Sequence, residues 1–358
     1  MIVYFNYKKL TDHDYRSNFK DYQKHNYIKP EEQIKKEISA IKNYWKCDPM
    51  HYYRYRLYEK NLSFDELIDY IPPYYFYNYY MPSIYNNIDI SVSQSKISMN
   101  DFFIMKKINT PFSIGIIKKG LIYNSLREKL LYPEFIEMLK ESNSDKFFIK
   151  PDKGLGGNGI IVIRKIKSDL YIDEELLNEK LFVTRVKHSD YIIQESILQR
   201  SDLNTINPTS VNTLRVVTQY FNNAYKISAA VLRIGRNGSL VDNSAQGGIS
   251  VNIDIEKGTL NKFAFTEHTM ERFEKHPDTN FRFDGFILKE WDKIKLNILD
   301  FANKASEFPE IAWDIALLEN KITAIEINSD YGLDHLQCCI GGMRRHLNIL
   351  PLEHQMRN

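Results

Sequence analysis

The stretch Phe147-Phe-Ile-Lys-Pro-Asp-Lys-Gly-Leu-Gly-Gly-Asn-Gly-Ile160 decides how the rest of the chain is interpreted. Two short apolar runs, 147–149 and 160–163, predict two strands of a hairpin. The turn between them holds four glycines, Gly154, Gly156, Gly157 and Gly159. Glycine tolerates φ > 0 and exposes backbone N–H groups, so such a turn can fold over a polyphosphate.

Lys150 ends the first of these strands, where its ammonium group can act as a point charge for phosphate oxygens. The turn differs from the phosphate loop of P-loop enzymes, which needs Lys-Ser or Lys-Thr after the last glycine and then a helix. Here β-branched residues follow Gly159, so we expect a strand instead. A mobile hairpin with no ligand explains the same glycines, and this alternative stays open here.

The composition is that of a globular protein. The chain has 358 residues, 43% of them hydrophobic and 26% charged, which predicts two or three domains or subdomains with a core. The net charge of +2 gives no electrostatic reason to expect nucleic acid as a partner. We expect no membrane span, because no apolar run approaches ~20 residues. The three cysteines, with no signal pattern at the N-terminus, favour a reduced, cytoplasmic protein.

Residues 1–85 predict a helical region rich in tyrosine. The stretch 30–45 has helical spacing of its apolar residues, and Ser63 with Glu66 predicts a capping box at the start of a second helix. Residues 74–80 contain five tyrosines and one phenylalanine. These rings suit a docking face, a sugar-stacking surface or a packing layer against the next domain, and we favour the packing layer.

From residue 86 onward we expect helices and antiparallel strands. The expected helices are 96–107, 134–141, 173–180 and 291–306. The expected strands are the isolated segment 191–194 and three hairpins, 214–221 with 225–233, 251–254 with 260–265, and 312–318 with 322–327. His188, His268 and His276 have no evident partner in the sequence, so we expect them at the surface.

The last hairpin is Trp313-Asp-Ile-Ala-Leu-Leu-Glu-Asn-Lys-Ile-Thr-Ala-Ile-Glu-Ile-Asn328. Asp314 lies on its first strand, and Glu326 and Asn328 lie two residues apart on its second, so the last two share one face. Two carboxylates and an amide oxygen suit a hard divalent cation. Polar strand ends that meet solvent are the alternative, and they explain Asp314 better than Glu326.

These motifs, in this order, resemble the ATP-grasp superfamily, and in particular the bacterial ATP-grasp proteins associated with sugar transfer and surface polysaccharide loci. The resemblance covers about residues 90–345. It implies an α+β fold in which two subdomains with antiparallel sheets clamp ATP. The implied division is a helical region 1–85, an N-terminal subdomain 86–149, a lid 150–200 and a catalytic subdomain 201–358. Two Mg²⁺ ions are implied at Asp314, Glu326 and Asn328.

The resemblance also implies which residues bind the nucleotide. The implied ATP-binding residues are Lys96, Lys150, Lys153, Gly154, Gly156, Gly157, Gln194, Glu195 and Ile197. Two positions depart from the family pattern. Ser95 stands where an aspartate usually precedes the first lysine, and Gln194 replaces the first of two acids after the adenine-clamping strand. The backbone of that strand would contact the adenine edge, so the second change need not matter.

Four short segments resemble the sugar-transfer type: Ser210-Val-Asn-Thr-Leu-Arg-Val-Val-Thr218, Leu232-Arg-Ile-Gly235, Val241-Asp-Asn243 and Gly247-Gly248. They imply that Arg215 and Arg233 face the γ-phosphate and the acyl phosphate, with Asn243 beside them. A salt-bridged strand arginine is the alternative for Arg215. Some related ligases carry an arginine two residues before the metal-binding aspartate, where this chain has Ala312, so Arg215 or Arg233 must supply that charge or the acceptor chemistry differs.

The substrate-binding residues implied by the resemblance are Asp242, Gly247, Gly248, Asp330, Asp334 and His335. Asp330, Asp334 and His335 follow the metal-binding strand, where similar ligases bind the nucleophile, and could recognise or deprotonate an amine. A helix capped by Asp334, with Gln337 completing the box, explains the same residues without a function.

The implied reaction is ATP-dependent ligation of a carboxylate to an amine through an acyl phosphate. The implied acceptor is a uronic acid of a capsule or other surface glycan, or its nucleotide-sugar precursor. The N-terminal region would then be able to contact other polysaccharide biosynthesis proteins. Two alternatives remain: a kinase of the same fold acting on a sugar or small acceptor, and a non-catalytic nucleotide-binding scaffold.

Overall fold

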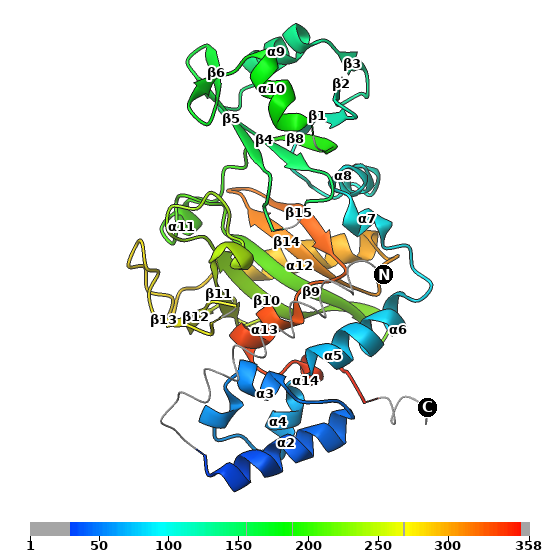
Figure 1. The fold of residues 1–358 in the computed structure, drawn as a ribbon, viewed down its shortest axis with the longest axis vertical. Coiled ribbons are helices and arrows are strands. Elements are labelled where there is room, and N and C mark those ends of the chain that lie inside the picture. Colours follow the sequence, from blue (N-terminus) through cyan, green and yellow to red (C-terminus); the bar gives the residue numbers. More distant parts are fainter. Residues whose placement is uncertain (1–28, 155, 188, 268, 352–358) are drawn as a thin grey trace.

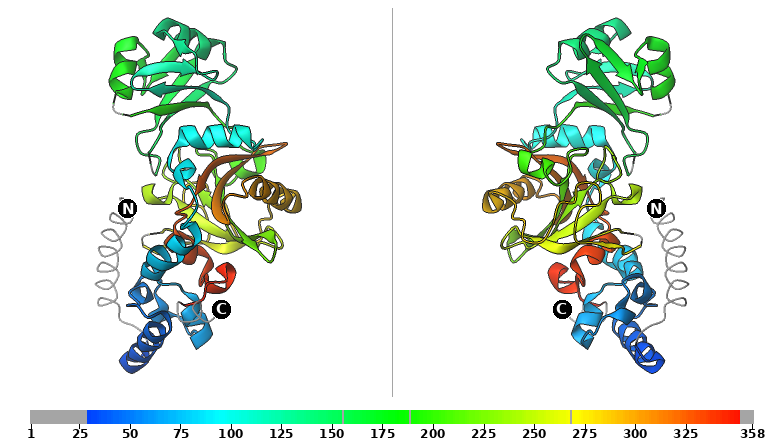
Figure 2. Two further views of the ribbon diagram at one scale, coloured as in Figure 1. Left: turned by 90° about the vertical axis from the view of Figure 1, so that its right-hand side faces the viewer. Right: turned by 90° about the vertical axis from the view of Figure 1, so that its left-hand side faces the viewer.

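The computed structural model describes residues 29–351 except 155, 188 and 268. Three parts follow one another along its long axis (Figure 1). One sheet with two helices lies at one end, a second sheet lies in the middle, and the helices of residues 31–85 lie at the other end. The two sheets therefore lie one after the other along this axis, and Figure 2 shows the same order from both sides.

The first sheet has eight strands in the order β3-β2-β1-β8-β4-β5-β6-β7, and every neighbouring pair is antiparallel. Its strands are β1 (Ser113–Lys118), β2 (Leu121–Asn124), β3 (Lys129–Leu130), β4 (Lys146–Pro151), β5 (Ile161–Ile166), β6 (Asp169–Ile172), β7 (Glu175–Leu176) and β8 (Tyr191–Glu195). Two helices, α9 (Tyr132–Glu141) and α10 (Glu179–Val186), pack on it through Phe135 and Phe182. The glycine-rich turn joins β4 to β5, as the sequence predicts.

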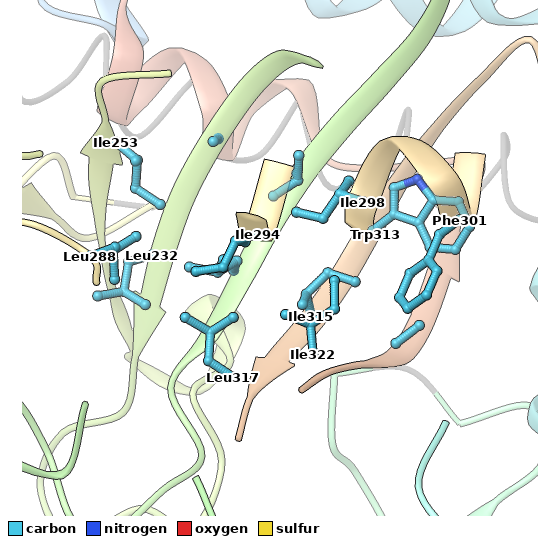
Figure 3. Packing of buried hydrophobic residues seen from close by; sticks show 14 of the residues in the cluster. Leu232, Ile253, Leu288, Ile294, Ile298, Phe301, Trp313, Ile315, Leu317 and Ile322 are labelled. Carbon is cyan, nitrogen blue, oxygen red and sulfur yellow. The ribbon is translucent and has the colours of Figure 1, made fainter. Parts of the chain in front are cut away.

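The second sheet has seven antiparallel strands in the order β13-β12-β11-β10-β9-β14-β15. They are β9 (Thr213–Phe221), β10 (Ala224–Ile234), β11 (Ile249–Ile253), β12 (Leu260–Phe265), β13 (Arg272–Phe273), β14 (Glu310–Leu317) and β15 (Ile322–Asn328). Helix α12 (Trp291–Lys304) covers one face of it, with Ile294, Ile298 and Phe301 packed against Trp313 and its neighbours (Figure 3). All three predicted hairpins are confirmed.

The opposite face of the second sheet packs against the N-terminal helices. These are α2 (Glu31–Trp45), α3 (His51–Arg54), η1 (Leu57–Glu59), α4 (Phe64–Asp69), α5 (Pro73–Tyr75), a π-helical turn η2 (Phe76–Tyr80) and α6 (Met81–Tyr85). Tyr75, Phe76 and Tyr77 are buried in one cluster with Val217 and Val231 of the sheet. The tyrosine-rich segment is therefore a packing layer, and the predicted capping box of Ser63 and Glu66 is confirmed.

The remaining helices connect these parts. They are α7 (Ser91–Gln94), α8 (Lys96–Met105), α11 (Ser201–Asn204), the 3₁₀ turn η3 (Ser244–Gln246), α13 (Leu333–Ile340) and α14 (Arg344–Leu347). Helix α8 lies where the two sheets meet, and α13 lies on the same side of the second sheet as the N-terminal helices (Figure 1). None of the helices within the described ranges has the length and apolar character needed to cross a bilayer.

Two expectations are wrong. The helix expected at 173–180 starts only at Glu179, because Asp173 and Glu174 both adopt φ > 0 in a tight turn between β6 and β7, and α10 begins after its cap, Asn178. His276 is buried, not exposed, and its Nε2 lies 2.8 Å from the carbonyl oxygen of Gly235. The expected division between residues 149 and 150 stays a prediction, and both residues lie within β4 of the first sheet. His188 and His268 lie outside the described residues.

Candidate active site

A cleft of about 290 Å³ opens between the two sheets. Its walls come from β4 and β8 of the first sheet, from β9, β10, β14 and β15 of the second, from α8, and from the loop that follows β10. Sixteen residues that the sequence singles out are among those that line it: Lys96, Lys150, Gly154, Gly156, Gly157, Gln194, Glu195, Ile197, Arg215, Arg233, Asp242, Asn243, Asp314, Glu326, Asn328 and His335. The fold therefore brings together segments more than two hundred residues apart.

A row of charged side chains crosses the floor of the cleft. Asp314 of β14 lies opposite Glu326 of β15 on one side and opposite Arg215 of β9 on the other. Directly opposed residues of antiparallel strands point to the same face of the sheet, so the three side chains meet above it. Ile325, the residue before Glu326, has no partner on β14 and forms a bulge in the ladder. Ile325 also lines the cleft.

Asp314 is held by two arginines. Nε and Nη2 of Arg215 donate to its two carboxylate oxygens at 2.5 and 2.9 Å, and Nη1 of Arg233 donates to Oδ2 at 3.0 Å. Burial opposes the charge of Asp314, but the two guanidinium groups outweigh it and lower its pKa to about 2. Arg215 is thus a salt-bridged strand arginine, and it lines the cleft at the same time.

Two lysines face this row from the other walls. Nζ of Lys96 lies 2.6 Å from the carbonyl oxygen of Gly154 and 3.3 Å from Oε1 of Glu326. Nζ of Lys150 donates to Oε1 of Gln194 at 3.0 Å. Burial lowers the pKa of Lys150 to about 8, and Lys96 acts in the same direction, while the charge of Glu326 opposes both. The amide of Gln194 holds Lys150 without neutralising its charge.

Two buried nitrogen donors in the cleft have no hydrogen-bond partner within the described part of the chain. They are Nε of Arg233 and Nδ2 of Asn328. Burial opposes the charge of Arg233, but Asp242 and Asp314 outweigh it and hold its pKa above the ordinary value. Buried polar groups normally have a partner, so these donors indicate a site for ligand oxygens.

The glycine-rich turn contacts the loop of residues 241–248 on the second sheet. Nε2 of Gln246 donates to the carbonyl oxygen of Gly156 at 2.7 Å. Gly156 and Gly157 both have φ > 0, a conformation that favours glycine. The turn thus lies over the floor of the cleft in this structure. Leu155, which lies within the turn, is outside the described residues.

Glycine at position 248 is required by close packing. A Cβ there would lie 2.6 Å from the carbonyl oxygen of Asp242 and 2.9 Å from that of Asn243. Asp242 itself accepts hydrogen bonds from the backbone N–H and the hydroxyl group of Thr213. Gly248 therefore shapes the loop that carries Asp242 and Asn243 into the cleft, and is buried beneath it.

The start of α8 shows what Ser95 does at the position where the resemblance leads us to expect an aspartate. Oγ of Ser95 accepts a hydrogen bond from the N–H of Ser98 and caps the helix. The same hydroxyl group donates to Oδ1 of Asp152 at 2.7 Å, and this carboxylate oxygen also accepts from the N–H of Ile97. Asp152 thus fixes the helix end that carries Lys96, and it does so from the turn that directly follows the strand carrying Lys150.

Helix α13 separates two residues that the sequence groups together. His335 lines the cleft, and its Nε2 lies 2.6 Å from Oγ of Ser250. Burial, followed by the charges of Arg233 and Arg215, holds its pKa well below the ordinary value, so the imidazole stays neutral. Asp334 points elsewhere: Tyr55 donates to its Oδ1 at 2.6 Å, and Nε of Arg54 lies 3.2 Å from the same oxygen.

Asp334 is therefore neither in the cleft nor a helix cap. Helix α13 begins at Leu333, with Gly332 in the cap position, and Gln337 bonds to the backbone of Ile71 instead of closing a box. Lys153 and Asp330 are exposed and do not line the cleft. Gly247 does not line it either, and shapes the loop with φ > 0.

The cleft also contains residues that we did not single out from the sequence. Met99, Asn100 and Phe103 of α8 line it together with Lys96, and Thr213 and Glu267 line it from the second sheet. The spacing of three and four residues after Lys96 places those α8 residues on one helix face, so this signal was present in the sequence. Glu267 follows a strand end and carries no such signal.

The oxygen donors fit a divalent metal ion. Arg215 and Arg233 occupy three of the roughly four lone-pair positions of the Asp314 carboxylate, which leaves one on Oδ1. Glu326 and Asn328 lie two residues apart on β15 and add a carboxylate and an amide oxygen, the ligand types that Mg²⁺ prefers. No group of three His, Cys, Asp or Glu side chains placed to hold a metal occurs among residues 29–351 as described, so a metal site here would take Asn328 as its third protein ligand.

Comparisons with solved structures give distant likenesses. D-alanyl-alanine synthetase A of Vibrio cholerae is 12% identical with a TM-score of 0.41, over 74% of this chain and 62% of that one. An ADP complex of N5-carboxyaminoimidazole ribonucleotide synthetase is 11% identical with a TM-score of 0.41, over 73% and 53%. D-alanine–D-alanine ligase of Helicobacter pylori is 13% identical with a TM-score of 0.37, over 72% and 57%. The chain thus spans less than two thirds of the length of each, and no curated protein matches it.

A family model gives the stronger finding. The model of the sugar-transfer associated ATP-grasp family matches residues 75–348, which is most of the chain and includes every residue named above from the cleft. The α+β architecture with two antiparallel sheets agrees with this match. The chain belongs to the sugar-transfer associated ATP-grasp family.

Proposed function

We propose that this protein is an ATP-dependent ligase that joins a carboxylate to an amine and releases ADP and phosphate. The observation that carries the proposal is the row Glu326–Asp314–Arg215, with Arg233 beside it, facing Lys96 and Lys150 across one cleft. This set supplies positive charge for a polyphosphate and oxygen ligands for a metal in the same space. A scaffold that only binds a nucleotide would have no need of all these groups.

In the first step, an oxygen of the substrate carboxylate attacks the γ-phosphorus of ATP. The bond between that phosphorus and the β,γ-bridging oxygen breaks, so an acyl phosphate forms and ADP leaves. Lys96 and Lys150 would neutralise the phosphate oxygens, and Arg233 would offer its unpaired Nε to the transferred group. Mg²⁺ held by Asp314, Glu326 and Asn328 would supply further charge neutralisation there.

In the second step, the amine attacks the acyl carbon. A C–N bond forms, the C–O bond to phosphate breaks, and the proton released by the amine passes to phosphate or solvent. His335 lines this cleft as a neutral imidazole, which suits it for orienting a substrate by a hydrogen bond better than for removing a proton from an ammonium group. The glycine-rich turn above the floor would limit access of water to the acyl phosphate.

We propose a uronic acid of a bacterial capsule or other surface glycan, or its nucleotide-sugar precursor, as the carboxylate, and an amino acid or small amine as the second substrate. The support for this substrate class is the sugar-transfer association of the family. We also propose that the protein acts in the cytoplasm. Contact with other polysaccharide biosynthesis proteins is part of the same proposal.

A screen of uronic acids against amines, with phosphate release from Mg-ATP as the readout, tests the proposal. A ligase releases ADP and free phosphate in equal amounts, and only when both substrates are present. Transfer of phosphate to a sugar without an amine would show a kinase and overturn the ligase assignment. A Glu326→Gln variant in the same screen separates release by this site from a contaminating phosphatase.

A further inference from the structure

Helix α8 presents one face to the cleft. Lys96, Met99, Asn100 and Phe103 all line the cavity, at the spacing of one helical stripe. The stripe changes character along its length: Lys96 reaches Glu326 and the glycine-rich turn, while Phe103 is fully buried and stacks on Trp313. Asn100 lies one turn after the charged end and one turn before the apolar end.

Asn100 is a buried polar residue. It is 4% exposed as a residue, and its Oδ1 is buried with no hydrogen-bond partner among the residues that the structure describes. A buried amide oxygen in this state costs free energy, and asparagine is also a poor residue for the middle of a helix. An apolar residue of similar size would avoid both costs, so the protein alone gives no reason for the amide.

The position of Asn100 indicates which ligand group it meets. The amide can both donate and accept, whereas the phosphate end of the cleft already holds Lys96, Lys150 and the arginines. Helix α8 packs beside β8, and Ile197 just beyond that strand lines the apolar part of the cleft. A group that lies between phosphates and an apolar surface, and carries both donors and acceptors, is a nucleoside.

We propose that Asn100 is a nucleotide-specificity residue that hydrogen-bonds to the nucleoside part of the ATP bound in this cleft. This inference rests on the proposed function, because it needs the cleft to bind ATP. It adds a residue that none of the motifs assigns. It also predicts an unusual combination in one variant: weaker nucleotide binding together with equal or greater stability of the free protein.

The test compares wild type with Asn100→Leu and Asn100→Ala. Calorimetric titration with Mg-ATP, and with ADP in the presence of a chelator, should show the Kd raised about tenfold in both variants and for both ligands, as expected for one lost hydrogen bond. The melting temperature of free Asn100→Leu should equal or exceed that of wild type, while its rise on adding Mg-ATP should be smaller. Asn297→Leu, the same change on the exposed side of α12, is the matched control and should bind as wild type does.

The outcomes separate this inference from the proposed function. Unchanged Kd values in both Asn100 variants, with normal binding by wild type, would overturn the role of Asn100 and leave the nucleotide site intact. A loss seen with Mg-ATP but not with ADP would place Asn100 at the metal or the γ-phosphate and overturn the nucleoside assignment. Failure of folded wild type to bind either nucleotide would overturn both.

Discussion

At the scale of single residues, the site is a set of compensated charges. Asp314 keeps its charge because Arg215 and Arg233 contact it, and Glu326 lies within 3.3 Å of Lys96. The pairing of Asp314 with the two arginines stabilises the cleft in the absence of ligand, because these charges would otherwise be buried alone. On the proposed function, binding of a polyphosphate and a metal ion would give the lysines and the carboxylates new partners of the same sign as those they have here.

Replacing Glu326 by Gln should abolish turnover while leaving the fold intact. The amide keeps the shape of the side chain but removes the charge that a metal ligand needs, so we expect ATP-dependent phosphate release to fall at least a hundredfold. Phosphate release and thermal unfolding are measured side by side. Glu256→Gln, at an exposed turn, is the matched control. Full activity in Glu326→Gln would remove the metal assignment.

The lowered pKa of Lys150 predicts a pH dependence of nucleotide binding. In the free protein this amine loses its proton as the pH rises through about 8. Above that value the cleft lacks one positive charge, so the Kd for Mg-ATP should increase several-fold between about pH 7 and pH 9. Lys150→Arg keeps its charge throughout and should bind with a flatter profile. Calorimetric titration of Mg-ATP across this pH range measures both profiles. The same change of Kd with pH in wild type and in Lys150→Arg would contradict the titration of Lys150 in this cleft.

At the scale of elements, hairpins carry the site and could be predicted from sequence, because each joins two runs rich in apolar and β-branched residues through an evident turn. Asn222 and Asn223, both with φ > 0, mark the turn of the β9–β10 hairpin clearly. The wrong helix at 173–180 shows the limit of such patterns. Acidic residues in Asp173-Glu174-Glu175 resemble a first helical turn, but Asn178 supplies a better cap and α10 starts later.

Gly248→Ala should disturb the loop that carries Asp242 and Asn243. The new Cβ would lie 2.6 Å from a backbone oxygen that has no freedom to move aside, so we expect a loss of about 1–3 kcal/mol in unfolding free energy and weaker nucleotide binding. Denaturant unfolding and Mg-ATP titration check both effects. Gly238→Ala is the control without a clash, because a Cβ there meets nothing within 4 Å and the variant carries only the cost of its own positive φ, which Gly248 does not have. Equal behaviour of the two variants would contradict the packing argument.

At the scale of the whole molecule, the N-terminal helices form one packed unit with the second sheet and α13. Tyr77 accepts a hydrogen bond from the N–H of Leu333 at the start of α13, and Tyr80 donates to the buried carboxylate of Glu310. The apolar cluster that contains Tyr75 and Phe76 continues through α13 into the second sheet. The same sheet face therefore carries the cleft in one half and the packing layer in the other.

Glu310 predicts how stability depends on pH. Its carboxylate accepts hydrogen bonds from Tyr80 and Gln219 at 2.7 and 2.9 Å and from Tyr331, and burial nevertheless raises its pKa to about 7. The folded state thus binds more protons than the unfolded chain between the ordinary pKa of a glutamate and about 7. The stability that this group contributes is present at low pH and is lost as the pH rises through about 7.

Glu310→Gln, which stays neutral, should remove this dependence. We expect its unfolding free energy to exceed that of wild type by on the order of 2 kcal/mol at about pH 8 and to match it at about pH 5. Denaturant unfolding at several pH values measures the difference. A difference between the two proteins that is the same at both pH values would show that Glu310 does not titrate in this range.

The site could be predicted from sequence only where a residue's type and place in a motif set its role. Lys150, Asp314 and Glu326 follow from strand patterns, and the register brings them together as expected. Asp334 could not be placed, because its partners Arg54 and Tyr55 come from a region with no motif. His276 fails for the same reason: its partner is the backbone of Gly235, which has no signature in sequence.

The most direct test of the account is a calorimetric titration of Mg-ATP into wild type, Lys150→Ala and Lys118→Ala. Lys118 lies exposed at the end of β1 in the same sheet, so it controls for the loss of one positive charge. The account predicts that wild type and Lys118→Ala bind with the same Kd, and that binding to Lys150→Ala is lost or greatly weakened. Equal binding by all three proteins, or no binding by folded wild type, would contradict the claim that this cleft is the nucleotide site.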